Sequence, residues 1–360
     1  FDILKDTLHS VYFTSDVGLD GENNRRTTDI TDGMRPVVSS IGFEGSYDLT
    51  DNIKVENRFR WSDIRGRFVS PFPSSIDPAQ NAADAVGALL LTGSFGGAVP
   101  AGTTFSLQYA NGPNGGQRIA DPANLNGNGQ VVREVLFNTE INDFGGYTND
   151  FKLSYVFGPA TLTAGFYKAR QTIDMDWTWN SYLLELKGNN AALLDVVNNA
   201  TGQVLTQNGL YAYGVPAFGN CCQRSYDVNY DINAPYIALG VDYGALNFDG
   251  SLRYDAFKAR GNYAATLQVA NFDVNNDGII QPVERSVSTI NNGDPDTVNY
   301  DVNYLSWSFG LNYRLQDTLA VFGRASRGGR ANADRLLFGL IQPDGGVRRD
   351  DAIDFVKQYE

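Results

Sequence analysis

The stretch Leu305-Ser306-Trp307-Ser308-Phe309-Gly310-Leu311-Asn312-Tyr313-Arg314-Leu315 decides the fold class of this chain. Every second residue is large and apolar, and the residues between them are mostly small or polar. Because successive side chains of a β-strand point to opposite faces, this alternation predicts a strand with one apolar and one polar face. After a turn at Gln316-Asp317-Thr318, a second alternating stretch at Leu319–Ala325 runs back, so the two together predict a β-hairpin.

The same unit occurs three more times nearer the N-terminus. The other units, each with its turn in parentheses, occupy residues 41–62 (Thr50-Asp51-Asn52), 151–166 (Gly158-Pro159) and 237–255 (Gly244-Ala245). In the first unit, one face of the returning stretch is almost wholly charged, with Lys54, Glu56, Arg58 and Arg60. Connections of roughly 50 to 80 residues separate one unit from the next, which contrasts with the very short turns.

Strand length and loop asymmetry together predict the architecture. Strands of about 10 to 13 residues are long enough to cross a hydrocarbon layer at a tilt. Short turns on one side and long loops on the other are typical of an outer-membrane barrel. The sequence therefore predicts an all-β fold, an antiparallel transmembrane β-barrel fragment of about 8 to 9 strands of a larger barrel, with short periplasmic turns and long extracellular loops. A soluble β-sandwich also alternates, but connections of this length are rare in compact soluble domains.

Composition excludes several other classes of function. With Lys+Arg 28 against Asp+Glu 41, the 360-residue chain carries a net charge of −13, which argues against a nucleic-acid partner. His9 is the sole histidine, so multi-histidine metal sites are excluded, and a Ser-His-Asp mechanism would depend on one residue near the terminus. The sequence contains no run of about 18 apolar residues, so it predicts no transmembrane helix. We therefore do not expect an enzyme.

The sequence at both termini indicates that this chain is a piece of a longer protein. The first residue is Phe1 rather than Met, and no basic region, apolar core and cleavage site follow it. At the other end, Asp354–Glu360 begins an alternating pattern and stops within it. We expect a barrel that is truncated at both ends.

Residues 307–328 resemble a hairpin of the TonB-dependent receptors of the Gram-negative outer membrane. The resemblance rests on Trp307–Leu315, an aromatic-rich strand, and on Gln316–Gly328, a short polar turn followed by a strand that ends in Phe-Gly-Arg-Ala-Ser-Arg-Gly. The segment Phe355–Glu360 is similar to the start of the next strand in this family. The resemblance covers roughly residues 35–360.

This resemblance implies a function and partners. Members have an N-terminal plug domain, which closes a barrel of about 22 strands, and they import scarce ligands with energy from the TonB complex. Residues 1–360 would then be a partial barrel domain, with the plug, its coupling segment (the TonB box) and the C-terminal strands absent. The implied location is the cell outer membrane, where the barrel contacts the lipid bilayer, and the implied ligand is a ferric siderophore or an oligosaccharide. Two alternatives stay open: a passive outer-membrane pore, and a secreted carbohydrate-binding or hydrolytic β-protein.

One connection contains a calcium-loop motif, which predicts a structural calcium ion. The oxygen ligands would come from Asp273, Asn275, Asp277, the carbonyl of Ile279, and Glu284. Gly278 allows the bend that brings Glu284 back toward Asp273. An Asn/Asp-rich surface turn is the alternative, since flanking helices are not evident and Pro282 lies within the motif.

Adjacent cysteines and a group of aromatic residues mark another connection. Cys221 and Cys222 are the only cysteines, so an oxidising exterior predicts a vicinal disulfide, with two free thiols or a bond to another chain as alternatives. The aromatic residues of this connection are Trp177, Trp179, Tyr182, Tyr211, Tyr213 and Phe218. They could bind a sugar or a siderophore, or they could form the small core of the loop itself, which is the favoured interpretation. Residues 182–186 and 191–197 read as short helical pieces.

The arginines on the predicted inner face are a second candidate for ligand binding. Arg58 and Arg324, together with Arg60, Arg253 and Arg314, could attract an anionic ligand to the lumen. A polar wall facing water needs such residues in any case, and this is the simpler interpretation.

Overall fold

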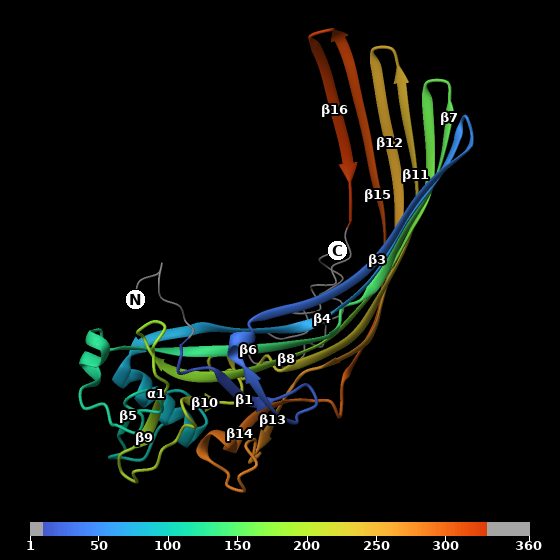
Figure 1. The fold of residues 1–360 in the computed structure, drawn as a ribbon. Coiled ribbons are helices and arrows are strands. Elements are labelled where there is room, and N and C mark those ends of the chain that lie inside the picture. Colours follow the sequence, from blue (N-terminus) through green and yellow to red (C-terminus); the bar gives the residue numbers. More distant parts are fainter. Residues whose placement is uncertain (1–9, 330–360) are drawn as a thin grey trace.

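The fold is one long, curved sheet with a compact group of loops at one end (Figure 1). This computed structural model describes residues 10–329. His9 and the strand start expected at Phe355–Glu360 lie outside the described residues. Within the described part, no helix is long and apolar enough to span a bilayer.

Within residues 10–329, nine antiparallel strands form the wall of the sheet. They are β3 (Met34–Thr50), β4 (Ile53–Pro78), β6 (Gln130–Asp143), β7 (Gly146–Phe157), β8 (Ala160–Glu185), β11 (Arg224–Tyr243), β12 (Leu246–Ala264), β15 (Asp296–Gln316) and β16 (Leu319–Arg327). Their order is β16-β15-β12-β11-β8-β6-β4-β3. At the hairpin end, β7 replaces β6 between β4 and β8, so β6 and β7 share one position in the wall.

All four predicted hairpins are confirmed, and so is the all-β class. The short turns fall between β3 and β4, β7 and β8, β11 and β12, and β15 and β16, at one end of the sheet (Figure 1). We call this part of the wall the hairpin half and the opposite part the external half. The sequence underestimated the strands, because β4 and β8 each contain 26 residues and extend far into the external half.

The register places apolar and charged side chains on opposite faces of the hairpin half. Phe43 lies opposite Phe59, and Phe309 lies opposite Gly250 on one side and Ala325 on the other. Phe43 is 64% exposed and Phe309 is 44% exposed, so these residues do not form a buried core. We call this apolar face the outer face and the opposite one, which carries Arg58 and Arg253, the inner face.

In the external half the two faces exchange character. The outer face of β8 becomes polar after Phe166, with Lys168, Arg170 and Asp174. On the inner face of this half, a buried apolar cluster is formed by Met175, Tyr226, Val228, Tyr230, Phe257, Ala259, Tyr263, Val298 and Tyr300. This exchange explains why the alternation predicted only the hairpin half of the strands.

The external connections fold together around one hydrophobic core. Their elements are β1 (Ser15–Leu19), β2 (Arg25–Asp29), η1 (Ile30–Asp32), α1 (Ala79–Thr92), β5 (Phe105–Tyr109), η2 (Pro122–Gly127), β9 (Leu194–Asn198), β10 (Leu210–Ala212), η3 (Pro216–Phe218), β13 (Thr266–Ala270), η4 (Pro282–Arg285) and β14 (Ser286–Ile290). Val86 of α1, Leu107 of β5 and Val196 of β9 are wholly buried in this core. The helical pieces expected at 182–186 and 191–197 were wrong, because these residues mainly end β8 and form β9.

Candidate ligand-binding site

Aromatic side chains gather on the inner face of the external half, where β4, β6 and β8 lie side by side. Phe137 of β6 is opposite Ser70 of β4 and Trp179 of β8, which fixes all three on this face. The ring centroids of Phe137 and Trp179 are 5.1 Å apart, and those of Phe72 and Trp179 are 5.9 Å apart. We define the aromatic patch as Phe68, Phe72, Phe137, Trp177, Trp179 and Phe218.

The rings of the aromatic patch are partly exposed. Phe218, in η3 above the wall, is 49% exposed and stacks against Phe72 at 6.5 Å between ring centroids. The other five rings are partly exposed rather than buried. Closer to the hairpin half, Arg60, Ile64, Tyr167 and Phe257 line a hollow of about 480 Å³. Half-exposed rings in a concave wall are typical of small-molecule sites.

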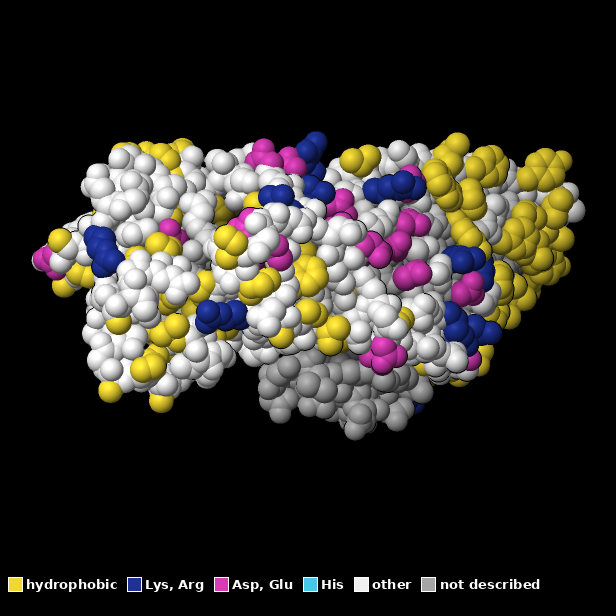
Figure 2. Space-filling view, turned by 90° about the horizontal axis from the view of Figure 1, so that it is seen from below, with side chains coloured by type: hydrophobic (Ala, Val, Ile, Leu, Met, Phe, Trp, Pro, Cys, Tyr) yellow, Lys and Arg dark blue, Asp and Glu magenta, His cyan; other side chains and the backbone are white. Residues whose placement is uncertain are grey.

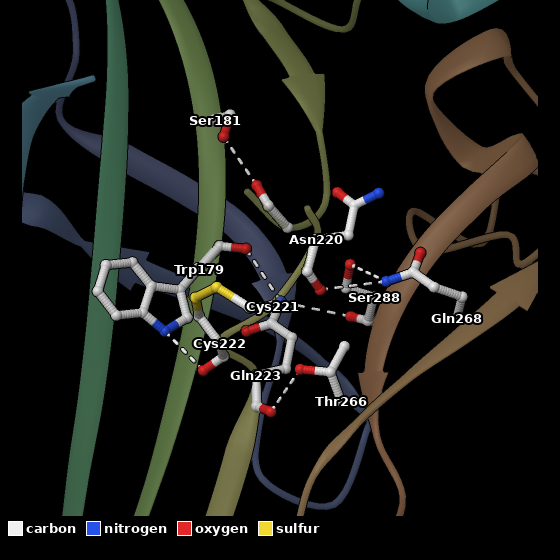
Figure 3. Close-up of a disulfide and its surroundings, with 10 residues drawn as sticks. Trp179, Ser181, Asn220, Cys221, Cys222, Gln223, Thr266, Gln268 and Ser288 are labelled. Atoms are coloured by element: carbon white, nitrogen blue, oxygen red, sulfur yellow. Dashed lines mark hydrogen bonds between the residues drawn. A yellow bond between two sulfur atoms is a disulfide. The ribbon is translucent and has the colours of Figure 1, made fainter. Parts of the chain in front are cut away.

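The two cysteines lie directly beside the patch. Cys221 and Cys222 form a vicinal disulfide in the structure, and the indole Nε1 of Trp179 donates a hydrogen bond to the carbonyl of Cys222 over 2.8 Å (Figure 3). Cys222 has a backbone φ of 102°, an unusual value for a residue with a side chain. The next residue, Gln223, donates to the carbonyls of Trp179 (3.0 Å) and Ser288 (3.3 Å). The cysteine turn therefore connects β8 to the β13–β14 hairpin.

The structure separates the predicted aromatic residues into two groups. Trp177 and Trp179 belong to β8 rather than to a loop, and with Phe218 they form part of the patch. Tyr182, Tyr211 and Tyr213 are 4%, 1% and 2% exposed within the core of the connections, so they cannot contact a ligand. Burial raises the pKa of both Tyr211 and Tyr213. The favoured interpretation from the sequence, a core formed by the connection itself, thus fits these three tyrosines.

Phe68, Phe72 and Phe137 were missed by the sequence interpretation. The first two continue the same face of β4 that carries Arg58 and Arg60, but there the face is aromatic instead of charged. Phe137 lies on β6, a strand that the sequence analysis did not predict. The alternation of Val135, Phe137 and Thr139 was a usable signal.

The five predicted arginines lie on the inner face, and three of them are paired with acids, whereas Arg60 and Arg314 form no ion pair within the described residues. Nε of Arg58 is 2.8 Å from a carboxylate oxygen of Glu44, and a guanidinium nitrogen of Arg324 is 2.7 Å from Asp249. Arg253 pairs with Asp255 at 2.7 Å and its guanidinium lies over the ring of Tyr167. Both Arg58 and Arg324 belong to the hairpin half, outside the aromatic patch.

The predicted calcium loop folds around hydrogen bonds between its own carboxylates and backbone. The carboxylate of Asp273 accepts from the backbone N–H of Gly278 over 2.8 Å, and that of Asp277 accepts from Ile279 over 2.8 Å. Gly278 has a φ of 81°, which permits the bend. Glu284, the predicted last ligand, is wholly buried and accepts from the backbone of Val274 over 3.0 Å. In the described part of the chain, no three His, Cys, Asp or Glu side chains form a metal-binding group.

Comparison with known proteins gives one family match. The family described as "TonB dependent receptor-like, beta-barrel" matches residues 5–352. No curated protein matches the chain.

The solved structures that match this chain include two receptors. The open form of the ferric-catecholate import receptor Fiu from E. coli K12 has 12% sequence identity and a TM-score of 0.39, with 84% of this chain and 37% of that chain covered. A double mutant of the Serratia marcescens hemophore receptor HasR, in complex with its hemophore HasA and heme, has 11% identity and a TM-score of 0.23, with 81% and 35% covered. This chain thus spans just over a third of the length of either receptor.

Proposed function

The chain belongs to the TonB-dependent receptor-like β-barrel family, and on this premise we propose that it forms part of an outer-membrane receptor for energised uptake of a large, scarce ligand. The outer face of the hairpin half contacts the lipid bilayer, and the inner face lines the watery lumen. The observation that carries the ligand-binding part of this proposal is the aromatic patch, with its partly exposed rings at the external end of that lumen.

The chemistry of the patch favours a ligand with ring faces. Aromatic rings present a negative face, which packs well against the polarised C–H groups of a sugar or against another ring. Trp177 and Trp179 are two positions apart on β8 and therefore share one face. Their ring centroids are 5.8 Å apart, so they offer two neighbouring surfaces to a ligand. An oligosaccharide and a siderophore both meet this requirement.

The paired arginines favour the oligosaccharide. Ferric siderophores of the catecholate class are strongly anionic, and they would be attracted by unpaired positive charge in the lumen. Arg58, Arg253 and Arg324 are each within 2.8 Å of a carboxylate, so their charges are largely compensated. Arg60, which lines the hollow, and Arg314 form no ion pair within the described residues, so the preference for a neutral ligand rests on the three paired arginines alone.

Transport would follow capture by the external loops and the patch, with a plug domain moved by the TonB complex. The proposed function is translocation of the ligand across the outer membrane, and it involves no covalent chemistry at any residue. This proposal differs from a passive pore, because uptake should stop when the energy-coupling complex is removed. It also differs from a secreted β-protein, because the receptor should be extracted from the membrane only with detergent.

The test is a binding screen on the full-length receptor in detergent. We expect a neutral oligosaccharide to change the intrinsic tryptophan fluorescence, and we expect Phe218→Ala and Trp179→Phe to weaken that binding about tenfold, in line with losing one good aromatic contact. Trp61→Phe is the matched control, because Trp61 lies on the outer face and is 44% exposed there.

Two results would contradict the proposal. Equal loss of binding in the Trp61 and Trp179 variants would mean that the inner patch is not the site. Binding of an anionic ferric siderophore, with no response to any oligosaccharide, would reverse the preference for a neutral ligand while leaving the receptor function intact.

A further inference from the structure

The turn that carries the two cysteines is fixed by hydrogen bonds to two different strands (Figure 3). From β8, the indole of Trp179 donates to the carbonyl of Cys222 over 2.8 Å. From β13, the hydroxyl of Thr266 donates to the carbonyl of Gln223 over 2.7 Å. The disulfide between Cys221 and Cys222 therefore lies in a segment that the surrounding strands hold in place.

The same segment determines where Phe218 lies. The backbone N–H groups of Phe218 and Asn220 both donate to the carbonyl of Val215, each over 2.9 Å. Cys221 also forms an isolated β-bridge with Val215, which is wholly buried. One buried residue thus ties the exposed ring of Phe218 to the first cysteine.

Two rings of the aromatic patch meet the disulfide from its two ends. Phe218, on the N-terminal side, stacks on Phe72 with 13° between the ring planes. Trp179, which bonds to the carbonyl on the C-terminal side, packs against the same ring of Phe72 at 90°. The arrangement of these three rings therefore depends on the backbone conformation of residues 218–222.

The disulfide restricts that backbone conformation. Adjacent cysteines joined through their sulfur atoms close a small ring, which includes the peptide bond between them. The φ of Cys222, 102°, persists only where the surroundings enforce it, because L side chains rarely adopt such values. With the ring open, Cys222 is free to return to a negative φ, and its carbonyl would turn away from the indole of Trp179.

A small reagent can reach the cysteines. Cys221 and Cys222 are half-buried, whereas Gln223 and Arg224, which follow them, are buried. One thiolate of a dithiol would attack a cysteine sulfur, so that the S–S bond breaks and the released cysteine thiolate takes a proton. The second thiol of the reagent then displaces the other cysteine. The reagent is oxidised to its own disulfide, and the cysteine pair gains two electrons and two protons.

We propose that the vicinal disulfide positions Phe218 and Trp179 for the ligand of the aromatic patch, and that a dithiol weakens ligand binding by opening it. The inference rests on the proposed function of the patch, and it adds the condition that tight binding requires oxidised cysteines. The cysteines act through the two rings that they position, so they are positioning residues.

The first test needs no ligand. The full-length receptor in detergent is equilibrated with mixtures of reduced and oxidised dithiothreitol, and its tryptophan emission is recorded. We expect one two-electron transition, because the indole of Trp179 loses its acceptor on reduction. Trp179→Phe should abolish the transition. Trp61→Phe should retain it, since Trp61 belongs to the outer face of the hairpin half, the end of the molecule where hydrophobic side chains gather in Figure 2.

The second test measures binding of maltoheptaose, a neutral oligosaccharide, by calorimetry in the same mixtures. Reduction should weaken binding about tenfold, the loss expected for one well-placed aromatic contact, with the same midpoint as the fluorescence transition. Cys221→Ser/Cys222→Ser should bind like the reduced receptor, with or without the dithiol. Phe218→Ala should bind weakly in both states, because the ring that the disulfide positions is missing.

Three results would overturn the proposal. The first is equal affinity before and after reduction, with both thiols detected by alkylation. The second is a fluorescence transition that is absent or that persists in Trp179→Phe. The third is a clear difference between the two midpoints. If the oxidised receptor binds no maltoheptaose, the proposed preference for a neutral oligosaccharide fails separately, and the fluorescence transition then decides by its presence or absence whether the disulfide positions Trp179.

Discussion

The hydroxyl of Tyr182 donates a hydrogen bond to Oδ1 of Asp16 over 2.6 Å, joining residues 166 positions apart. The side-chain amide of Asn180 donates to the same oxygen, also over 2.6 Å. Asp16 is 2% exposed, and its burial raises the pKa of the carboxyl although both hydrogen bonds lower it. One buried oxygen thus attaches the β1–β2 hairpin to the external end of β8.

Replacement of Asp16 by Asn should stabilise the receptor at neutral pH. Because the pKa of Asp16 is raised in the folded state, the carboxyl contributes to folding stability in full below its unfolded pKa, near 3.8. This stabilisation is lost as the pH rises through the folded pKa. Asn cannot ionise, and its oxygen can still accept from Tyr182 and Asn180. Thermal unfolding of the variant should therefore depend less on pH above pH 4 than unfolding of the unmodified receptor.

The variant Asp16→Ala provides the contrast. It leaves the Tyr182 hydroxyl and the Asn180 amide buried without this acceptor, so we expect a loss of about 1–3 kcal/mol in unfolding free energy. If Asp16→Asn were as destabilising as Asp16→Ala at pH 7, the ionised carboxylate would be the important form, and the predicted pH dependence would be wrong.

A charge on the outer face should prevent stable insertion. Leu311 is 50% exposed and lies opposite Phe248 within the apolar band. We expect Leu311→Arg to destabilise the barrel in lipid by about 2–4 kcal/mol, measured by unfolding of the full-length receptor in vesicles. Asn312→Arg, the neighbouring position on the inner face, should have little effect. Equal tolerance of both variants would mean that the outer face does not meet lipid.

Gly261 should not tolerate a side chain. Its φ is 151°, and a Cβ there would lie 1.9 Å from the carbonyl oxygen of Asp227 on β11. Gly261→Ala should therefore separate β11 from β12 locally and reduce the yield of folded protein. The folded fraction can be measured from the shift in gel mobility on heating. Gly323→Ala on β16 is the control, because a Cβ there meets nothing within 4 Å. A normal yield for the Gly261 variant would contradict the strand register.

The calcium loop gives a prediction that calorimetry can test. If Asp273 and Glu284 both bind calcium, as the motif predicts, the double variant Asp273→Ala/Glu284→Ala of the full-length receptor should show no calcium binding. Asp294→Ala, at an exposed position beyond β14, is the control and should bind calcium normally. Because Glu284 accepts from Gln281 over 3.1 Å and from Val274, Glu284→Ala alone should also destabilise the loop without calcium. Unchanged affinity in the double variant would eliminate this site.

The cysteine pair can be examined by alkylation and mass spectrometry. A vicinal disulfide predicts that Cys221 and Cys222 resist alkylation in the unreduced, unfolded receptor and that both react after reduction. Alkylation without a reducing agent would indicate free thiols, and a reducible dimer would indicate a bond to another chain. Because Trp179 bonds to the carbonyl of Cys222, Cys222→Ser should also alter the tryptophan fluorescence.

The hairpins could be predicted from sequence because their determinants are local. Alternation such as that of Leu305–Leu315 and a tight turn at Gly244-Ala245 are complete within about 20 residues. The external half could not be predicted in the same way, because the faces of β8 exchange character after Phe166. A strand whose apolar side changes midway no longer shows a single alternating pattern.

The candidate site was only partly predictable for a related reason. Trp177, Trp179 and Phe218 could be identified by type, but their separation from Tyr182 depends on which face of β8 each residue occupies. Phe72 and Phe137 join the patch through cross-strand pairing between distant segments. Likewise, the bond between Asp16 and Tyr182 has no local signature, since it depends on how the connections pack.

The shared core of the external connections affects how other molecules recognise this surface. Since α1 and β5 come from one connection and β9 from another, and they bury Val86, Leu107 and Val196 together, the outermost surface is assembled from distant parts of the chain. An antibody or a bacteriophage that attaches there would meet a discontinuous epitope. Synthetic peptides copied from one connection should therefore be poor immunogens for the intact cell surface.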